Sequence, residues 1–266
     1  MGKITVFLTD AQVLFREGIH FILSGEDDFE VIGETTSNDE ACTHIMANPP
    51  VIALLGMMNA GTSGAVIARR IKRNLPEVFV ILTVEDRSDE AVYNAVKSGA
   101  SACITRNVEP NYLLDLFRVV AQGSHPIIEE MLAPGISTLI MADFKDAEEL
   151  NGQIGEVMAR LMPPEVQLLN SIAAGGTVEQ ISEKLSMSEA DVRRYLRIIL
   201  NKVIFNAQAR ELIEAVKRTY GEAVQPSGDY VTRAEFYELK ALVMELLQER
   251  SGEAGKPASQ RRTITR

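Results

Sequence analysis

Short β-rich runs alternate with amphipathic stretches over the first 125 residues, and this alternation limits the fold more than any other feature. Each amphipathic stretch carries apolar residues at helical spacing, which predicts a helix after every strand. Repeated strand–helix units favour a doubly wound α/β domain with a parallel sheet, right-handed crossovers and helices on both faces. The predicted strands are residues 4–8, 29–34, 51–55, 78–83 and 102–105.

The carboxyl ends of these strands form the first candidate site, because open α/β sheets bind their ligands at that edge. The sequence places Thr9 and Asp10 there, followed by Gly56, Thr83 and Arg106 on the later strands. We therefore expect these residues to lie close together.

The rest of the chain changes in composition. Residues 126–156 are strongly acidic, which predicts a linker with some helix, bent at Pro134-Gly135. Residues 157–220 predict a helical domain. Three further segments are predicted: a loop (221–231), an amphipathic helix (232–250) and a disordered basic tail (251–266).

Two consecutive helices in the helical domain carry clear start signals. Thr177 and Gln180 form a capping box, and Ser188 is expected to cap a second helix that begins at Glu189. Only a short turn separates the two helices, which is typical of a helix-turn-helix. A shared apolar face is expected from Val178, Ile181, Leu185, Met187, Val192, Leu196, Ile199 and Val203.

The net charge of −10 argues against a general polyanion binder unless the charges are unevenly distributed. They are uneven: residues 1–125 and 126–156 carry −6 each, residues 221–266 carry 0, and residues 157–220 carry +2. The positive segment is therefore the candidate helix-turn-helix.

A basic second helix of this kind can bind DNA, because Arg bonds guanine edges and both Arg and Lys neutralise phosphates. The alternative is a solvated basic face on an ordinary helix. The residues expected to face DNA are Thr177, Glu189, Arg193, Arg194, Tyr195, Arg197 and Lys202.

Three motifs fall in register with one known family. LFREG follows the first predicted strand, SGAS precedes the fifth, and LMPPE opens the helical domain. Over about residues 3–218 the chain resembles bacterial response regulators of the NarL/FixJ group. This resemblance implies a flavodoxin-like (βα)5 receiver domain, a LuxR-type helix-turn-helix domain, and transcription regulation in a two-component system.

The chain departs from the family where the family's chemistry takes place. Asp10 matches the first member of an acidic pair, and Thr83 matches the hydroxyl residue of the fourth strand. Four other positions differ: Ala11 replaces the second acid, Gly56 the phosphorylated aspartate, Cys103 the switch aromatic and Arg106 the lysine.

These departures imply a pseudo-receiver that works without aspartyl phosphorylation. Gly56 offers no nucleophile, and a single carboxylate is a poor Mg²⁺ site. Arg106 is expected to fill part of the pocket and to pair with Asp10.

Two hypotheses stay open for the role of this domain. It is either a scaffold for dimerisation or protein docking, or a pocket with open space at Gly56 that binds a small-molecule signal. Met57 and Met58 could line such a pocket, although loop packing is the favoured interpretation.

A homodimer is expected on promoter DNA, because one helix-turn-helix makes too few contacts for genomic specificity. The helix at 232–250 is either the dimerisation element or an appendage of its own domain. Its candidate contact residues are Phe236, Leu239, Val243 and Leu246. The competing function is a protein-interaction adaptor, or a ligand-sensing pseudo-receiver, with little DNA binding.

Other functions lack support in the sequence. No run is long and apolar enough to span a membrane, and Cys42 and Cys103 suggest buried thiols in a reducing cytoplasm. No phosphate-binding glycine motif, metal-ligand spacing or nucleophile elbow occurs. We therefore expect no cofactor, no metal and no enzymatic activity.

Overall fold

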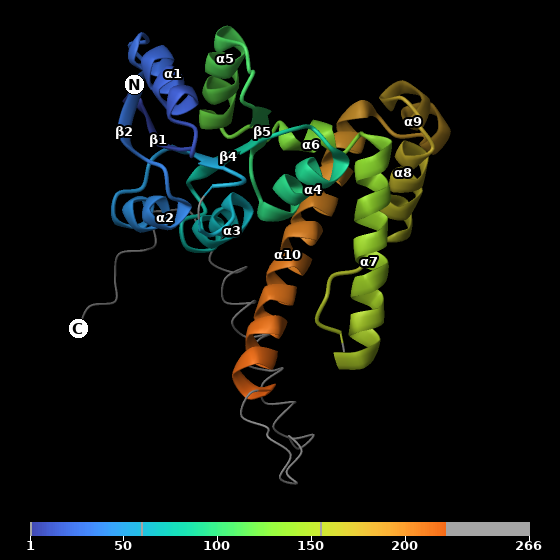
Figure 1. Ribbon diagram of the computed structural model, residues 1–266. Helices are drawn as coiled ribbons and strands as arrows, with labels where there is room; N and C mark the ends of the chain where they lie inside the picture. The colour runs from blue at the N-terminus through green and yellow to red at the C-terminus, as the bar shows by residue number, and fades with distance from the viewer. Residues whose placement is uncertain (1, 60, 155, 222–266) are drawn as a thin grey trace, which may run out of the picture. The chain divides into compact units, whose positions relative to one another are not determined.

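The computed structural model describes residues 2–59, 61–154 and 156–221 (Figure 1). The chain divides into two compact units, Met1–Ala207 and Gln208–Arg266. The loop predicted beyond residue 221, the helix predicted at 232–250 with its four candidate contact residues, and the predicted tail lie outside the described residues.

The first unit contains the predicted parallel sheet, in the strand order β2-β1-β3-β4-β5. All adjacent pairs are parallel, which confirms the doubly wound α/β fold. Gly56 is in register with Thr83, so both lie at the carboxyl edge of the sheet. The strands are β1 (Ile4–Thr9), β2 (Phe29–Thr35), β3 (Ile52–Gly56), β4 (Phe79–Val84) and β5 (Ala102–Thr105).

Helices cover both faces of this sheet (Figure 1). One apolar core joins the sheet to α1 and α5, and the other joins it to α2, α3 and α4. In β3, Ile52 and Leu54 enter the first core, whereas Ala53 and Leu55 enter the second, as the period-two geometry of a strand requires. These helices are α1 (Val13–Ser24), α2 (Asn38–Ala47), α3 (Gly64–Asn74), α4 (Asp89–Ser98) and α5 (Pro110–Ala121).

The acidic segment 126–156 is more regular than the linker predicted from its composition. It contains the short α6 (Ile127–Glu130) and the long α7 (Pro134–Ile154). Pro134 is the first residue of α7 and does not bend a helix, because proline fits the first helical turn, where its missing N–H has no partner to lose.

Helix α7 packs on the sheet-bearing half through α4 and on the helical half through α8 (Pro163–Ala173). Its buried residues recur every three or four positions, which explains why it is a helix despite its acidic composition. The buried apolar residues are Ile136, Ile140, Phe144 and Ala147.

The two predicted consecutive helices are α9 (Val178–Leu185) and α10 (Glu189–Gly221). The capping box of Thr177 and Gln180 is present, and Ser188 accepts a hydrogen bond from the Asp191 N–H at 3.1 Å. Helix α10 runs beyond residue 203, so it is longer than predicted. The shared apolar face is confirmed, with Ile181, Val192, Leu196, Ile199 and Val203 buried.

A partly buried ion pair connects α8 to α10. Glu165 accepts a hydrogen bond from the Met162 N–H at the start of α8. Its two carboxylate oxygens also accept hydrogen bonds from Lys202 Nζ, at 2.7 and 2.8 Å. Lys202 Nζ also donates to the Arg160 carbonyl at 3.0 Å. Lys202 is therefore a structural residue of the helical region.

None of the described helices is both long and apolar enough to cross a membrane.

We predict that Glu165→Ala lowers the free energy of unfolding by about 3 kcal/mol, because it removes a helix cap and leaves Lys202 without its buried partner. Urea denaturation measures the loss. Glu183→Ala, at an exposed site on α9, is the matched control and should change stability by less than about 0.5 kcal/mol. Equal effects of the two substitutions would show that the ion pair has no structural role.

Candidate functional site

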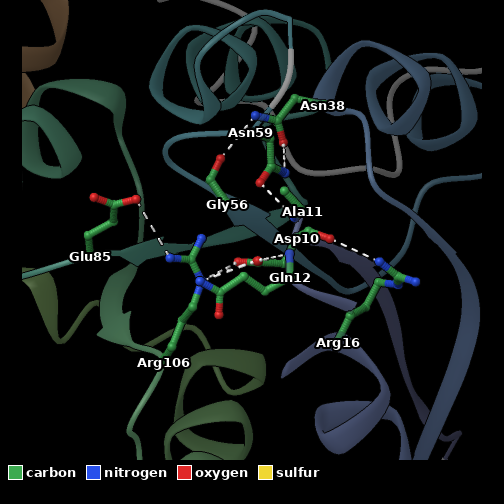
Figure 2. Close-up of polar contacts among 9 residues, drawn as sticks. All are labelled: Asp10, Ala11, Gln12, Arg16, Asn38, Gly56, Asn59, Glu85 and Arg106. Carbon is green, nitrogen blue, oxygen red and sulfur yellow. Dashed lines mark hydrogen bonds and ion pairs between the residues drawn. The ribbon is translucent and has the colours of Figure 1, made fainter. Parts of the chain in front are cut away.

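A buried carboxylate at the end of β1 is the centre of the first candidate site (Figure 2). Asp10 is only 1% exposed. Its oxygens accept hydrogen bonds from Arg106 Nε at 3.2 and 3.3 Å and from the Gln12 N–H at 2.8 Å. The predicted pairing of Arg106 with Asp10 is thus present in the structure.

Arg106 is the residue that follows β5, and its side chain extends past the ends of β3 and β4 to Asp10. Its Nη1 atom also lies 3.9 Å from Glu85 Oε1, which is an outer, solvent-facing contact. One guanidinium therefore supplies the counter-charge at this edge of the sheet, where the carboxylate would otherwise be buried alone.

Asn59 fills the space beside Gly56. The open space that the small-molecule hypothesis requires is therefore not present there. A Cβ atom at Gly56 would overlap the side-chain amide of Asn59. Asn59 Oδ1 accepts a hydrogen bond from the Ala11 N–H at 2.9 Å, and its Nδ2 donates to Asn38 Oδ1 at 2.9 Å. This amide is held at both ends, so it cannot easily move out of the space.

Asn38 extends the same network into the loop between β3 and α3. Its side chain is fully buried, and Nδ2 donates to the carbonyls of Gly56 and Thr62 at 2.9 and 3.0 Å. The Thr62 N–H donates in turn to Asp39 Oδ2 at 3.0 Å. Hydrogen bonds from the side chain and from the backbone of Thr62 lower the pKa of Asp39. The first residues of α2 therefore fix the loop that closes the site.

Thr83 and Cys103 are close to this edge but are not part of the polar network. Thr83 is buried, and among the described residues its hydroxyl has no hydrogen-bond partner. Burial raises the pKa of the Cys103 thiol to about 12, so Cys103 is a neutral, inert thiol. Met57 is buried in the core and Met58 is exposed, which agrees with the loop-packing interpretation for Met57.

The second candidate site is the exposed surface of α9 and the start of α10. Thr177, Glu189, Arg193, Arg194 and Arg197 are all exposed there. Arg194 Nη2 lies 2.9 Å from Asp191 Oδ1, and its guanidinium lies 5.4 Å from the centre of the Tyr195 ring.

Several of the predicted DNA-facing residues are already engaged in ion pairs within the chain. Lys202 belongs to the ion pair with Glu165, which argues against a contact with phosphate. Arg193 Nε donates to Glu129 Oε1 at 2.9 Å, and its Nη1 lies 3.3 Å from Glu189 Oε2.

The sequence did not single out Asn38, Asn59 or Glu129. An amide in a loop and an acid in a four-residue helix follow no periodic pattern. Only their placement by the surrounding fold shows what they contact.

The N-terminal half matches a known domain family. Residues 6–118 match the family model of the response regulator receiver domain, so the five-stranded α/β part has a receiver fold. Relatives that align with about four fifths of the chain are named transcriptional or response regulators, in agreement with the resemblance that the sequence motifs carry.

Two curated relatives illustrate this likeness. The transcriptional regulatory protein DegU of Brevibacillus brevis is 26% identical over 224 residues, which cover 81% of this chain and 94% of the relative. A nitrate/nitrite response regulator protein homolog of Haemophilus influenzae is 27% identical over 202 residues, covering 76% and 90%. The solved structure of ChrA, a response regulator in a heme-sensing two-component system, is 22% identical and covers 80% of this chain and 100% of its own, with a TM-score of 0.42.

We predict that Arg106→Leu destabilises the protein by about 3 kcal/mol, because it leaves the Asp10 carboxylate buried without a counter-charge. Asp10→Asn added to this variant should restore part of the loss, since an amide is cheaper to bury than an unpaired charge. Denaturant unfolding of the wild type, both single variants and the double variant measures the coupling. Additive losses would mean that the two residues do not interact.

Proposed function

We propose that the chain is a DNA-binding transcriptional regulator whose receiver domain acts without aspartyl phosphorylation. The observation that carries this proposal is the Asn59 amide, which occupies the space beside Gly56, where the family resemblance places the phosphorylated aspartate. The two parts of the proposal, the altered receiver and the DNA-binding helix, rest on separate observations.

Phosphoryl transfer needs a nucleophile at the end of β3, and glycine has none. The pocket also does not fit Mg²⁺, which binds proteins through carboxylate oxygens. Asp10 is the one carboxylate of the family's pocket that this chain keeps, and Arg106 already holds both of its oxygens. Ala11 and Gly56 add no ligand.

The family's switch is also altered in this chain. It couples a hydroxyl, at Thr83 in this chain, to an aromatic residue, and Cys103 occupies the aromatic position. A small, buried, neutral thiol cannot swing between a buried and an exposed position as an aromatic ring can. A receiver domain fixed in one state is therefore the better-supported hypothesis.

The filled space beside Gly56 favours a scaffold over a small-molecule pocket. Asn38, Asn59 and the Ala11 N–H satisfy one another, so a ligand would have to break this network before it could bind. A protein partner on the outer surface of the domain meets no such barrier.

The DNA-binding part of the proposal is supported by the exposed arginines of α10 and by the names of the relatives. The relatives are called transcriptional regulators or response regulators. Arg194 and Arg197 are exposed near the start of α10, where helix-turn-helix proteins contact bases and phosphates. Thr177, at the start of α9, completes the proposed contact surface with Glu189, Arg193 and Tyr195. Lys202 is excluded because it pairs with Glu165.

We further infer that the chain binds promoter DNA as a homodimer, since two half-sites are needed for genomic specificity. The adaptor function predicted as an alternative would leave the exposed basic surface of α10 without a role.

We predict that Arg194→Ala combined with Arg197→Ala weakens binding to duplex DNA at least tenfold and lowers the salt dependence by about two counterions. Fluorescence anisotropy over a range of salt concentrations measures both. Lys145→Ala, which removes one positive charge from the exposed surface of α7, is the control and should leave the salt slope unchanged. If the double variant binds like the wild type, α10 is not the DNA-binding element.

A second prediction concerns the receiver pocket. Restoring the family residues by Ala11→Asp, Gly56→Asp and Arg106→Lys should not create a phosphoacceptor while Asn59 fills the space. The same variant with Asn59→Ala should gain one phosphoryl group after treatment with acetyl phosphate. Intact-mass analysis detects the adduct. Equal modification with and without Asn59→Ala would contradict the role given to Asn59.

A further inference from the structure

The first turns of α10 expose one continuous stripe of side chains. Its members recur at intervals of three or four residues, which places them on one face of the helix. The opposite face is buried through Val192, Leu196, Ile199 and Val203. The exposed stripe consists of Glu189, Ala190, Arg193, Arg194, Arg197, Ile198 and Asn201.

Ile198 is the large apolar side chain in this stripe, and it is 39% exposed. Arg197 precedes it directly, Arg194 lies one helical turn earlier, and Asn201 follows three residues later. Ile198 is thus an apolar group in a charged and polar part of the surface. An apolar side chain in this position gains free energy when α10 binds a surface that removes it from water.

The helix holds Ile198 at a fixed place. Leu196 and Ile199, which lie close to it in sequence, are buried. Lys202, one turn later on the same face, is held by the Glu165 carboxylate and by the Arg160 carbonyl. The branched Cβ atom of isoleucine also restricts the first side-chain torsion. A rigidly presented side chain of this kind is suited to specific recognition.

The major groove of DNA offers an apolar group that such a side chain can contact. Each thymine displays a methyl group on C5 there, and apolar side chains recognise thymine by packing against it. Arginine recognises guanine edges or phosphates instead. The stripe therefore combines two kinds of recognition chemistry, with guanidinium groups at Arg194 and Arg197 and an apolar group at Ile198.

Ile198 lies at a level of α10 that the proposed function already places on DNA. Glu189 is the first residue of α10, so Ile198 belongs to the third turn. The helix rises about 1.5 Å per residue, which puts Ile198 and Arg197 at nearly the same depth along its axis. A docking position that brings Arg197 to the DNA therefore also brings Ile198 to the groove.

We propose that Ile198 selects a thymine in each half-site by packing against the methyl group on C5 of that base. This inference rests on the proposed DNA-binding function and adds a base preference to it. The contact requires no hydrogen bond, so it complements the arginines, which supply charge and contacts to phosphate or guanine.

The test begins with the DNA sequence that the full-length wild type selects from a library of random duplexes. Each thymine in one half-site is then replaced in turn by deoxyuridine, which removes only the methyl group and keeps the base pairing. Fluorescence anisotropy at one salt concentration compares the duplexes. At one thymine position, the wild type should bind the uracil duplex about fourfold more weakly, as expected for the loss of one buried methyl group.

This loss must depend on Ile198. Ile198→Ala should bind the thymine and uracil duplexes equally at that position, because the carbons beyond Cβ are gone. Val119→Ala is the matched control, since Val119 on α5 is also 39% exposed, and it should keep the fourfold difference. Each ratio compares two duplexes with one protein preparation, so a partial loss of folded protein cancels.

Three results would overturn the proposal while leaving DNA binding intact. The wild type could bind DNA without a preferred sequence or thymine, or it could bind the thymine and uracil duplexes equally at every position. The uracil penalty could also persist in Ile198→Ala, in which case another residue contacts the methyl group. Failure of the proposed function gives a different result, because the wild type would then bind no duplex at all.

Discussion

The ion pair between Asp10 and Arg106 is the constraint on which the receiver half depends. A carboxylate that is 1% exposed is strongly destabilising unless a counter-charge and hydrogen-bond donors surround it. Arg106, the residue after the edge strand β5, provides the charge, and the Gln12 N–H provides a donor. The charge of Asp10 is thereby balanced by a side chain of the same domain.

Around this pair, other side chains at the carboxyl edge of the sheet form hydrogen bonds with one another and with the backbone. Asn59 fills the space beside Gly56, and Asn38 ties the following loop to the start of α2. A domain closed in this way is suited to hold other elements in place. The core under α4 continues into α6 and α7 and onward to α8 and α10. The receiver fold would then act through its surface and its loops. The contact between Arg87, in the loop before α4, and Glu130 is one example of such a loop contact.

Much of the fold could be predicted from the sequence, because the spacing of apolar residues along the chain shows which face of each helix or strand is buried. The strands, most helix starts and the pairing of Arg106 with Asp10 follow from patterning and from the residues at strand ends. The length of α7 was not predicted, because the acidic composition of this segment suggested a linker although its apolar residues recur at helical spacing. The engagement of Lys202 by Glu165, and of Arg193 by Glu129, joins residues 37 and 64 positions apart. No local pattern carries such pairings, so they require the three-dimensional structure.

The central proposal is a DNA-binding regulator whose receiver domain acts without aspartyl phosphorylation. The most direct test measures the affinity of the wild-type, full-length protein for duplex DNA before and after incubation with acetyl phosphate and Mg²⁺, with intact mass recorded on the same samples. The account predicts no phosphoryl adduct and an unchanged affinity. A stable adduct accompanied by a change in DNA affinity would contradict it.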